Sequence, residues 1–519
     1  MPTANANRRW CLRLLAMGLF AASIAASTPA WSADKSWNSG CFGTWSQDAK
    51  WTPAGTPGSA DAARLGDLPA ANNASVFLDG STEVGSVAVS NGVGLYTNNH
   101  PLKVNGDVTL GNGYINLANS PQAIDFEAGN VTVNAFGFFE LEGATAKIHG
   151  QLNLSTADSH LQGGGEIQFT GAGKTFNNNA FDWTVSTPLK LVQQNGGQFD
   201  LDGAGLGSTE LYLRNGATLT FQGGSLSDPV DAIIAMENGT TLAMNLDSPW
   251  MHQFGYMPIV NNQNVAAPAK IAGADVTLSS TWLNVQANSK LEIDANLTTA
   301  GGTEIWVDAT GRLDVLKDAV LGDGTMITTG RVVFHGDTQV GDGGVYSLGT
   351  LENAASGTMR LNNGANQEQA SFENHGLFEV GNSPGMATVE DFTNEADGTW
   401  LVEIGGYAAG TEHDLLIVAD DAMLGGTLNV ALVDLGGGVF QPLVGDEFTI
   451  LTAGDSLSGA FLADPVSYAA GKIFHWSVLT DGNAVTLQLA AITVPEPATY
   501  VLAALGALAL VAVRRRNRD

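Results

Sequence analysis

The sequence predicts an all-β protein whose body is a right-handed parallel β-solenoid, or β-helix. Glycine supplies 64 of the 519 residues and only 14% of residues are charged, which suits short strands joined by tight turns. Between residues 102 and 154, apolar and polar residues alternate in short bursts separated by Asn-Gly, Gly-Asn and Glu-Gly steps. Bursts recur after 22 residues from Leu102 to Ile124 and after 23 residues from Val108 to Val131. A period near twenty with three strands per repeat is typical of a solenoid.

The same alternation predicts which side chains point into the solenoid. Residues two apart on a strand lie on one face, so each burst should place one apolar pair inward. The expected inward residues are Leu102/Val104, Val108/Leu110, Ile115/Leu117, Ile124/Phe126, Val131/Val133, Phe139/Leu141, Leu152/Leu154 and Ile148. Two or three antiparallel β-sandwiches are an alternative architecture for strands of this length.

Local composition divides the chain into five parts. They are a signal peptide at 1–32, a Trp-rich N-terminal cap at 33–74, the parallel solenoid at 75–370, a C-terminal β module at 371–492 and an apolar and basic tail at 494–519. A cap is expected because an open solenoid end exposes unpaired strand edges. Trp37, Trp45 and Trp51 fit an aromatic cap, with a sugar-stacking site as the alternative interpretation.

Two segments resemble secreted β-solenoid proteins with autotransporter-like repeats. The Trp-rich cap, followed by Pro57 and Asp61, is similar to the opening of such proteins. The segment from Phe372 resembles the closing segment of passenger-type solenoids, with landmarks at 382–385, Glu403, Asp414, 426–428 and 445–448. An autotransporter would continue into a membrane barrel, and because no such sequence follows, we do not expect export by that route.

The first 32 residues predict a secretory signal peptide. Three arginines lie within the first thirteen residues, an apolar stretch follows at 14–26, and small residues precede the expected cleavage between Ser32 and Ala33. The Arg8-Arg9 pair faintly resembles a twin-arginine signal, but ordinary secretion is the favoured interpretation.

The last residues combine a proline-rich motif, an apolar stretch and a basic end. The sixteen residues from 498 to 513 carry no charge, and as a helix they would span about 24 Å, short of the ~30 Å hydrocarbon core. Arginines favour the cytoplasmic side, which places the body outside. We therefore expect a marginal transmembrane helix at 498–513 and a basic tail at 514–519, whose stop-transfer cluster is Arg514, Arg515, Arg516 and Arg518.

This order of features resembles the PEP-CTERM sorting signal, with Pro495, Glu496 and Pro497 as the motif. In that family an exosortase, a membrane-embedded transpeptidase-like enzyme of Gram-negative bacteria, recognises the motif. The resemblance implies export by the secretion machinery, transient anchoring in the inner membrane and cleavage near the motif. It also implies a final place at the cell surface or outside the cell, either released or attached to exopolysaccharide.

Charge and cysteine content exclude some classes of protein. The chain has 52 acidic against 22 basic residues, a net charge of −30 that repels nucleic-acid phosphates, so we expect no nucleic-acid partner. Of the two cysteines, Cys11 lies in the signal peptide and Cys41 is alone, so no internal disulfide is expected.

Apparent catalytic motifs have simpler interpretations. Residues 381–385 fit G-x-S-x-G, but Pro384 lacks the N–H that an oxyanion hole needs, so this is a loop. Residues 171–175 imitate a phosphate-binding loop without its first glycine and are taken as a turn. The eight histidines show no metal-ligand spacing, and His413 alone neighbours a carboxylate, Asp414.

Two further clusters contain residue types that are found in carbohydrate sites. Asp200 and Asp202 share a strand face and could serve glycoside hydrolysis, but a solvated or weakly calcium-binding pair is favoured. The aromatic segment 250–257 could form a carbohydrate platform, with loop packing as the favoured interpretation. We assign no catalytic residue, no cofactor and no metal site.

The sequence as a whole indicates an exported, non-enzymatic β-solenoid of the cell surface or biofilm matrix, structural or adhesive in association with exopolysaccharide. The alternative is a β-helix polysaccharide lyase or glycoside hydrolase. Lyases acting on acidic sugars need basic residues, and only five arginines lie between residues 34 and 495, which disfavours that alternative.

Overall fold

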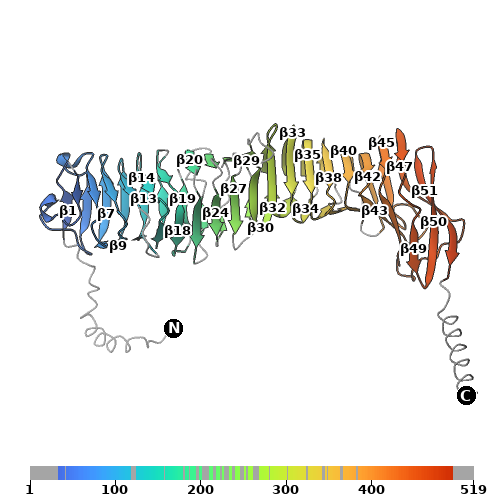
Figure 1. The fold of residues 1–519 in the computed structure, drawn as a ribbon, viewed down its shortest axis with the longest axis horizontal. Coiled ribbons are helices and arrows are strands. Elements are labelled where there is room, and N and C mark those ends of the chain that lie inside the picture. The colour runs from blue at the N-terminus through green and yellow to red at the C-terminus, as the bar shows by residue number, and fades with distance from the viewer. Residues whose placement is uncertain are drawn as a thin grey trace, which may run out of the picture.

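The computed structural model describes residues 33–494 with short interruptions, most of them between 179 and 267. Figure 1 shows an elongated, gently curved rod in which short strands stack side by side along one axis. Within the described part, helix is limited to two single 3₁₀ turns, Asp48–Lys50 and Pro69–Ala71. The prediction of an all-β solenoid is therefore confirmed.

The N-terminal half of the rod has three sides. One sheet contains, in spatial order, β3 (Trp51–Thr52), β1 (Asp34–Trp37), β4 (Ala62–Leu65), β7 (Ser86–Ser90), β10 (Val108–Gly111), β13 (Val131–Val133), β16 (Leu152–Leu154), β19 (Lys174–Asn178), β22 (Gln198–Asp200) and β25 (Ser225–Leu226). The second contains β2 (Gly43–Thr44), β5 (Ser75–Phe77), β8 (Gly94–Tyr96), β11 (Tyr114–Asn116), β14 (Phe138–Glu140) and β17 (His160–Gln162). The third side begins with β6 (Thr82–Val84), β9 (Leu102–Val104), β12 (Phe126–Ala128), β15 (Thr145–Ile148) and β18 (Gly165–Phe169).

Pairing between successive turns is parallel and in register. Val108 lies between Val87 of the preceding turn and Val131 of the next, which confirms the predicted 23-residue step. The alternative architecture, an antiparallel β-sandwich, requires antiparallel pairing between neighbouring strands. The described solenoid strands pair in parallel and therefore do not form sandwiches.

One predicted step is wrong. Leu102 pairs with Phe126 rather than with Ile124, and the inward pair of β12 is Phe126 and Ala128. Ile124 is only partly buried. The reason is a corner at Asp125, which is itself buried and accepts a hydrogen bond from the Thr145 N–H at 2.9 Å. The strand begins only after this corner, so its inward pair starts two residues later than expected, at Phe126 instead of Ile124.

The remaining inward residues agree with the prediction. All are buried and belong to one hydrophobic cluster that runs through the described rod: Leu102, Val104, Val108, Leu110, Ile115, Leu117, Val131, Val133, Phe139, Leu141, Ile148, Leu152 and Leu154. Removing such side chains from water is the main favourable contribution to the stability of the described rod.

Strands lengthen in the second half of the rod. β30 (Ala269–Ser279), β32 (Lys290–Ala300), β33 (Glu304–Val315) and β35 (Thr325–Phe334) each serve two adjoining sides. For example, β30 pairs with both β27 (Thr241–Asn245) and β28 (Trp250–His252). A register irregularity between Ala272 and Asp275 marks where β30 passes from one ladder to the other.

Parallel pairing extends on both sides of the predicted interval 75–370. It begins with β1 and β4. At the other end it includes β44 (Leu415–Val418) with β47 (Glu447–Ala453), and β45 (Asp421–Leu424) with β48 (Ser456–Gly459). The domain boundaries and the right-handed sense of the solenoid stay predictions.

Antiparallel strands cover an edge at each end of the rod. β3 pairs antiparallel with β1 at the N-terminal end. At the C-terminal end, β50 (Lys472–Asp481) pairs with β49 (Val466–Ala469) and with β51 (Ala484–Thr493), and β51 also covers the edge of β47. Covered edges prevent further strand pairing along the axis.

A ladder of buried asparagines stabilises one corner. Asn353 ends β38 (Thr350–Asn353), Asn374 ends β40 (Asn366–Asn374) and Asn394 ends β42 (Met386–Asn394). The Nδ2 of Asn353 donates to Oδ1 of Asn374 at 2.8 Å, and the Nδ2 of Asn374 donates to Oδ1 of Asn394 at 2.6 Å. The ladder continues to the Gly425 carbonyl at 2.6 Å, so consecutive turns are held together by side-chain as well as backbone hydrogen bonds.

Candidate functional site

The outer face of the six-stranded sheet carries two neighbouring columns of side chains. On the five strands β5, β8, β11, β14 and β17, strand register places one residue in each column, while the middle residue points inward and is buried. The two-residue strand β2 adds Thr44 to the second column alone. The first column contains Ser75, Gly94, Tyr114, Phe138 and His160. The second contains Thr44, Phe77, Tyr96, Asn116, Glu140 and Gln162.

Aromatic rings follow one another across this face from strand to strand. The rings of Phe77 and Tyr96 stack with centroids 4.8 Å apart, and the ring of Tyr114 meets that of Tyr96 edge to face at 5.3 Å. Further along the rod, Phe138 stacks on His160 at 4.4 Å. These rings are partly exposed to solvent, unlike the inward aromatic side chains. We call the set Phe77, Tyr96, Tyr114, Phe138 and His160 the aromatic face.

Gly94 makes room for the ring of Tyr114. A Cβ at position 94 would lie 2.2 Å from Cζ of Tyr114, so only glycine allows the ring to lie back over this strand. The Tyr114 hydroxyl hydrogen-bonds that of Tyr96. Burial, followed by this hydrogen bond, raises the pKa of Tyr114 to about 12. The phenol therefore stays neutral and acts only as a hydrogen-bonding group at physiological pH.

Polar groups lie beside the aromatic rings. Asn116, Glu140 and Gln162 occupy the second column on the strands that carry Tyr114, Phe138 and His160. The Nδ2 of Asn116 donates to Oε2 of Glu140 at 2.7 Å, which orients both side chains along the face. Apolar rings next to amide and carboxylate groups form a surface that can stack on one face of a ligand and hydrogen-bond its edge.

The N-terminal tryptophans are part of the core. Trp37, Trp45 and Trp51 are buried, and their rings meet edge to face at 5.2 and 4.9 Å. The Nε1 of Trp51 donates to the Trp45 carbonyl at 2.9 Å. The three side chains are at most 3% exposed, which agrees with the favoured interpretation of an aromatic cap.

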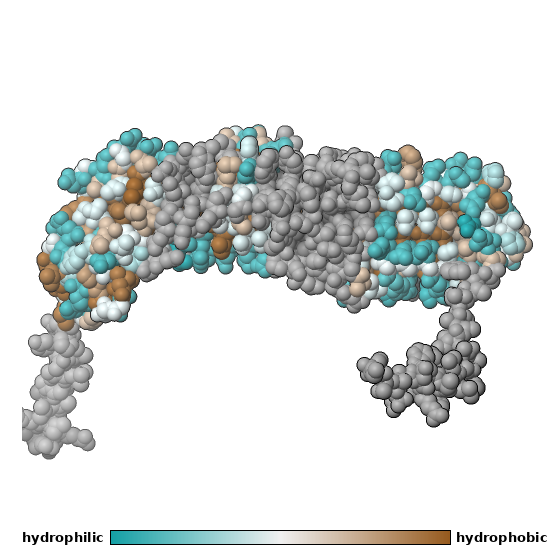
Figure 2. All heavy atoms as spheres, turned by 180° about the vertical axis from the view of Figure 1, so that it is seen from behind, coloured by the Kyte–Doolittle hydropathy of each residue, from teal (hydrophilic) through white to brown (hydrophobic). Residues whose placement is uncertain are grey.

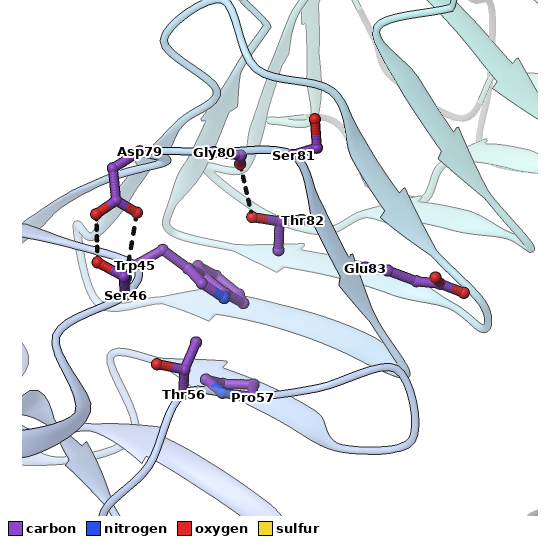
Figure 3. A pocket seen from close by; sticks show the side chains of 9 residues that line it. All are labelled: Trp45, Ser46, Thr56, Pro57, Asp79, Gly80, Ser81, Thr82 and Glu83. Carbon is purple, nitrogen blue, oxygen red and sulfur yellow. Dashed lines mark hydrogen bonds between the residues drawn. The ribbon is translucent and has the colours of Figure 1, made fainter.

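A polar pocket adjoins the tryptophan cluster (Figure 3). Its wall includes Trp45, Ser46, Thr56, Asp79 and Glu83. Figure 3 shows the Asp79 carboxylate turned toward Ser46, whose N–H donates to it at 3.3 Å, and the hydrogen bonds from Ser46 lower the pKa of Asp79. A hydrogen bond from Asn105 lowers the pKa of Glu83. Both carboxyls therefore favour the ionised form, and neither has the raised pKa of a general acid.

The motifs that imitate catalytic loops are followed by strands. In the segment 381–385, Asn382 and Ser383 lie outside the described residues, and β42 follows directly. In the segment 171–175, Gly173 lies outside them, and β19 begins at Lys174. A nucleophile elbow and a phosphate-binding loop both need a helix at this point, so the non-catalytic interpretation is supported.

The other two candidate sites, the aspartate pair and the aromatic segment, lie partly outside the described residues. Asp202 lies outside the described residues, as does the side chain of Asp200 at the end of β22. The segment 250–257 runs through β28 and into β29 (Gly255–Val260), but its side chains are not described. Among the described residues, no three His, Cys, Asp or Glu side chains group as metal ligands would.

The landmarks of the closing segment meet in the structure. Oδ1 of Asp414 accepts a hydrogen bond from the Gly385 N–H at 2.7 Å, and Oδ2 accepts one from the Glu403 N–H at 2.7 Å. Burial raises the pKa of Asp414 to about 8, against the opposing effect of these two bonds. Next to it, His413 is buried between the carbonyls of Gly406 and Thr449, each 3.2 Å from a ring nitrogen, and burial lowers its pKa.

A perturbed carboxyl is often a sign of a catalytic site, but Asp414 faces backbone N–H groups and has 1% of its surface exposed. We therefore interpret Asp414 and His413 as a structural junction that joins three segments of the C-terminal part. The resemblance in sequence to passenger-type closing segments thus corresponds to a specific contact between distant residues.

The predicted processing sites lie at or beyond the two ends of the described residues. Ser32 lies outside the described residues, which begin at Ala33, so signal cleavage between them stays a prediction. The sorting motif Pro495, Glu496 and Pro497 lies outside as well, as do the segment 498–513 and the cluster Arg514, Arg515, Arg516 and Arg518. Within the described part of the chain, no helix is long and apolar enough to cross a membrane.

Comparison with known proteins bears on this tail. The fold defines a parallel β-solenoid protein, and residues 493–516 match the family described as the PEP-CTERM protein-sorting motif. The chain is thus a β-solenoid that carries a PEP-CTERM sorting signal, and the signal implies exosortase-dependent export with membrane anchoring at the C-terminus. No curated protein matches the chain.

Proposed function

We propose that this chain is a non-enzymatic, structural or adhesive protein of the cell surface or extracellular matrix, held there in association with exopolysaccharide. An exosortase releases its tail after transient anchoring in the inner membrane. The observation that carries the proposal is the direct succession of an extended solenoid and a PEP-CTERM motif: β51 ends at Thr493, and Pro495 follows two residues later.

This short connection limits how far the body can lie from the membrane while the tail is anchored. Four steps of extended chain from Val494 to Ala498 span at most about 14 Å, so the C-terminal module lies against the headgroup layer while the tail is anchored. Exposed apolar side chains are present at that end of the rod: Leu462 is 73% exposed, Tyr468 75% and Val494 65%. Figure 2 shows hydrophobic atoms gathered at the C-terminal end, which is compatible with a membrane-proximal position.

The architecture suits a structural role. A rod built from repeated turns offers long lateral faces, and its stability comes from contacts between neighbouring turns. The acidic composition, with a net charge of −30, keeps such rods soluble and separate. A β-helix lyase or glycoside hydrolase is the alternative, and it predicts depolymerisation of a polysaccharide by the purified chain.

The decisive experiment combines location, mass and activity. The chain is expressed in a bacterium that contains an exosortase, and intact mass is measured on surface-extracted protein. We expect loss of the residues before about Ala33 and of those after the Pro495–Pro497 motif, with no release of sugar from a panel of polysaccharides. Recovery of the intact 519-residue chain from the surface would contradict the sorting proposal, and steady depolymerisation would favour the enzyme alternative.

A further inference from the structure

We propose that the aromatic face binds an extended, neutral polysaccharide chain that lies along the rod and crosses its strands. This inference rests on the proposed function, because it names both the class of exopolysaccharide that would be held and the surface that would hold it.

Ring spacing along the rod is the first argument. Tyr96, Tyr114 and Phe138 lie on the successive strands β8, β11 and β14. Neighbouring strands are about 4.8 Å apart, comparable with the length of one sugar ring in an extended chain. The Tyr114 ring lies back over β8 at Gly94, with its centroid 5.3 Å from that of Tyr96, so these two rings form one broad aromatic surface. A polymer parallel to the rod axis meets this surface first and then the stacked pair of Phe138 and His160 on β14 and β17.

The second argument is the composition of the neighbouring column. A pyranose ring has an apolar face and a rim of hydroxyl groups, each of which donates and accepts hydrogen bonds. The rings supply stacking surfaces, and the side chains of Asn116, Glu140 and Gln162 run beside them on the same strands with amide and carboxylate groups. Aromatic stacking with hydrogen bonds at the edge is the combination that recognises such a ligand.

The third argument is charge. From Tyr96 to Gln162, the two columns contain one carboxylate, Glu140, and no lysine or arginine. An acidic or sulfated polymer would meet uncompensated repulsion on this face, in a chain whose net charge is −30. A neutral polymer avoids that cost, which is why we assign this class of ligand.

Core packing does not account for these rings. The interior of the same strands is already filled by Leu95, Ile115 and Phe139, each with 0% of its surface exposed. Tyr114 and Phe138 alternate with these residues and are partly exposed. An outward, partly exposed row of aromatic side chains on an acidic protein is a surface that favours a ligand over water.

The test is affinity gel electrophoresis of the full chain in mild detergent. The gels contain hydroxyethyl cellulose, galactomannan or dextran as neutral probes, and carboxymethyl cellulose as the anionic counterpart. Tyr114→Ala and Phe138→Ala remove one ring each, whereas Tyr114→Phe keeps the ring and removes only the hydroxyl. Tyr468→Ala is the matched control, because Tyr468 is 75% exposed in β49 at the other end of the rod. Circular dichroism and thermal unfolding check that each variant is folded.

We expect retardation by at least one neutral probe and none by carboxymethyl cellulose. Each alanine variant on the aromatic face should weaken binding about tenfold, and Tyr114→Phe and Tyr468→Ala should bind within about twofold of the parent chain. The inference is overturned if no neutral probe retards the parent, if carboxymethyl cellulose retards it as strongly, or if folded Tyr114→Ala and Phe138→Ala bind like the parent. Equal loss in Tyr468→Ala also overturns it.

Sorting is measured separately, so the two proposals can fail independently. A chain that is exported and processed but not retarded overturns the glycan-binding face alone. A chain that is retarded but never processed supports the face and overturns the sorting proposal.

Discussion

Asp414 accepts a hydrogen bond from the Gly385 N–H at 2.7 Å, although the two residues are 29 positions apart in sequence. The same carboxyl group also accepts the Glu403 N–H at 2.7 Å. One buried side chain therefore joins the start of β42 to the end of β43 (Thr399–Ile404) and to the strand β44 that follows Asp414. Because buried N–H groups without an acceptor are costly, we expect this junction to govern the stability of the C-terminal part.

The first prediction concerns the pH dependence of this junction. The pKa of Asp414 is raised to about 8 in the folded chain from 3.8, so the folded chain holds the proton more tightly between these values. Its contribution to stability is complete below about pH 4 and is lost as the pH rises toward 8. Asp414→Asn removes this titration, and because its Nδ2 cannot accept one of the two N–H groups, it is less stable than the parent at low pH but has no pH dependence from this position. Thermal unfolding between pH 4 and 8 should show that the midpoint of the parent falls relative to that of Asp414→Asn. Parallel midpoints across the range would contradict the assignment.

The second prediction concerns the asparagine ladder. Asn374→Ala removes one of the two acceptors of the buried Asn353 Nδ2, which keeps the Leu377 carbonyl at 2.8 Å, and it removes the donor to the buried Asn394 Oδ1. We expect a loss of about 2–4 kcal/mol in the free energy of unfolding, measured by urea denaturation. Asn429→Ala is the control, because Asn429 is exposed on β46 (Thr427–Leu432) and should change stability by less than about 0.5 kcal/mol. Equal effects of the two variants would show that the ladder adds nothing beyond the backbone pairing.

The third prediction concerns the space that Gly94 provides. Gly94→Ala puts a Cβ 2.2 Å from Cζ of Tyr114, so the ring must leave its position. We expect a cost of about 1–3 kcal/mol together with a changed near-ultraviolet tyrosine signal. Gly80→Ala is the matched control, since a Cβ there would have no neighbouring atom within 4 Å. An unchanged spectrum in Gly94→Ala would mean that Tyr114 does not occupy the described position.

The fourth prediction separates the two halves of the sorting signal. Glu496→Ala leaves the apolar segment and the arginines intact, so uncleaved protein should accumulate in the inner membrane. Replacing Arg514, Arg515 and Arg516 by alanine removes the charges that hold this end in the cytoplasm, so premature release into the periplasm is expected. Cell fractionation with an antibody to the body distinguishes these locations. Asp481→Ala, an exposed acidic change in β50, serves as the control. If both sorting variants reach the exterior at the rate and mass of the parent, the tail is not a sorting signal.

Much of the fold follows from local patterns in the sequence. Alternation identified the buried pairs from Leu102/Val104 to Leu152/Leu154, because the two-residue period of a strand is a local property. It failed at Ile124, where the turn at Asp125 interrupts the strand. The candidate face was missed because its rings come from different turns. Tyr96 and Tyr114 are 18 residues apart, whereas Tyr114 and Phe138, which are paired, are 24 apart.

By itself, the sequence determined an all-β parallel solenoid, its inward side chains and a PEP-CTERM tail, since strand alternation and the sorting motif are both read from contiguous residues. The tertiary structure decided which residues of different turns become neighbours. Those contacts include the Tyr96–Tyr114 pair, the Asn353–Asn374 bond and the Gly385–Asp414 junction. The physical reason is that turn lengths vary along the rod, and each added or missing residue at a corner changes which side chains stack across the next strand.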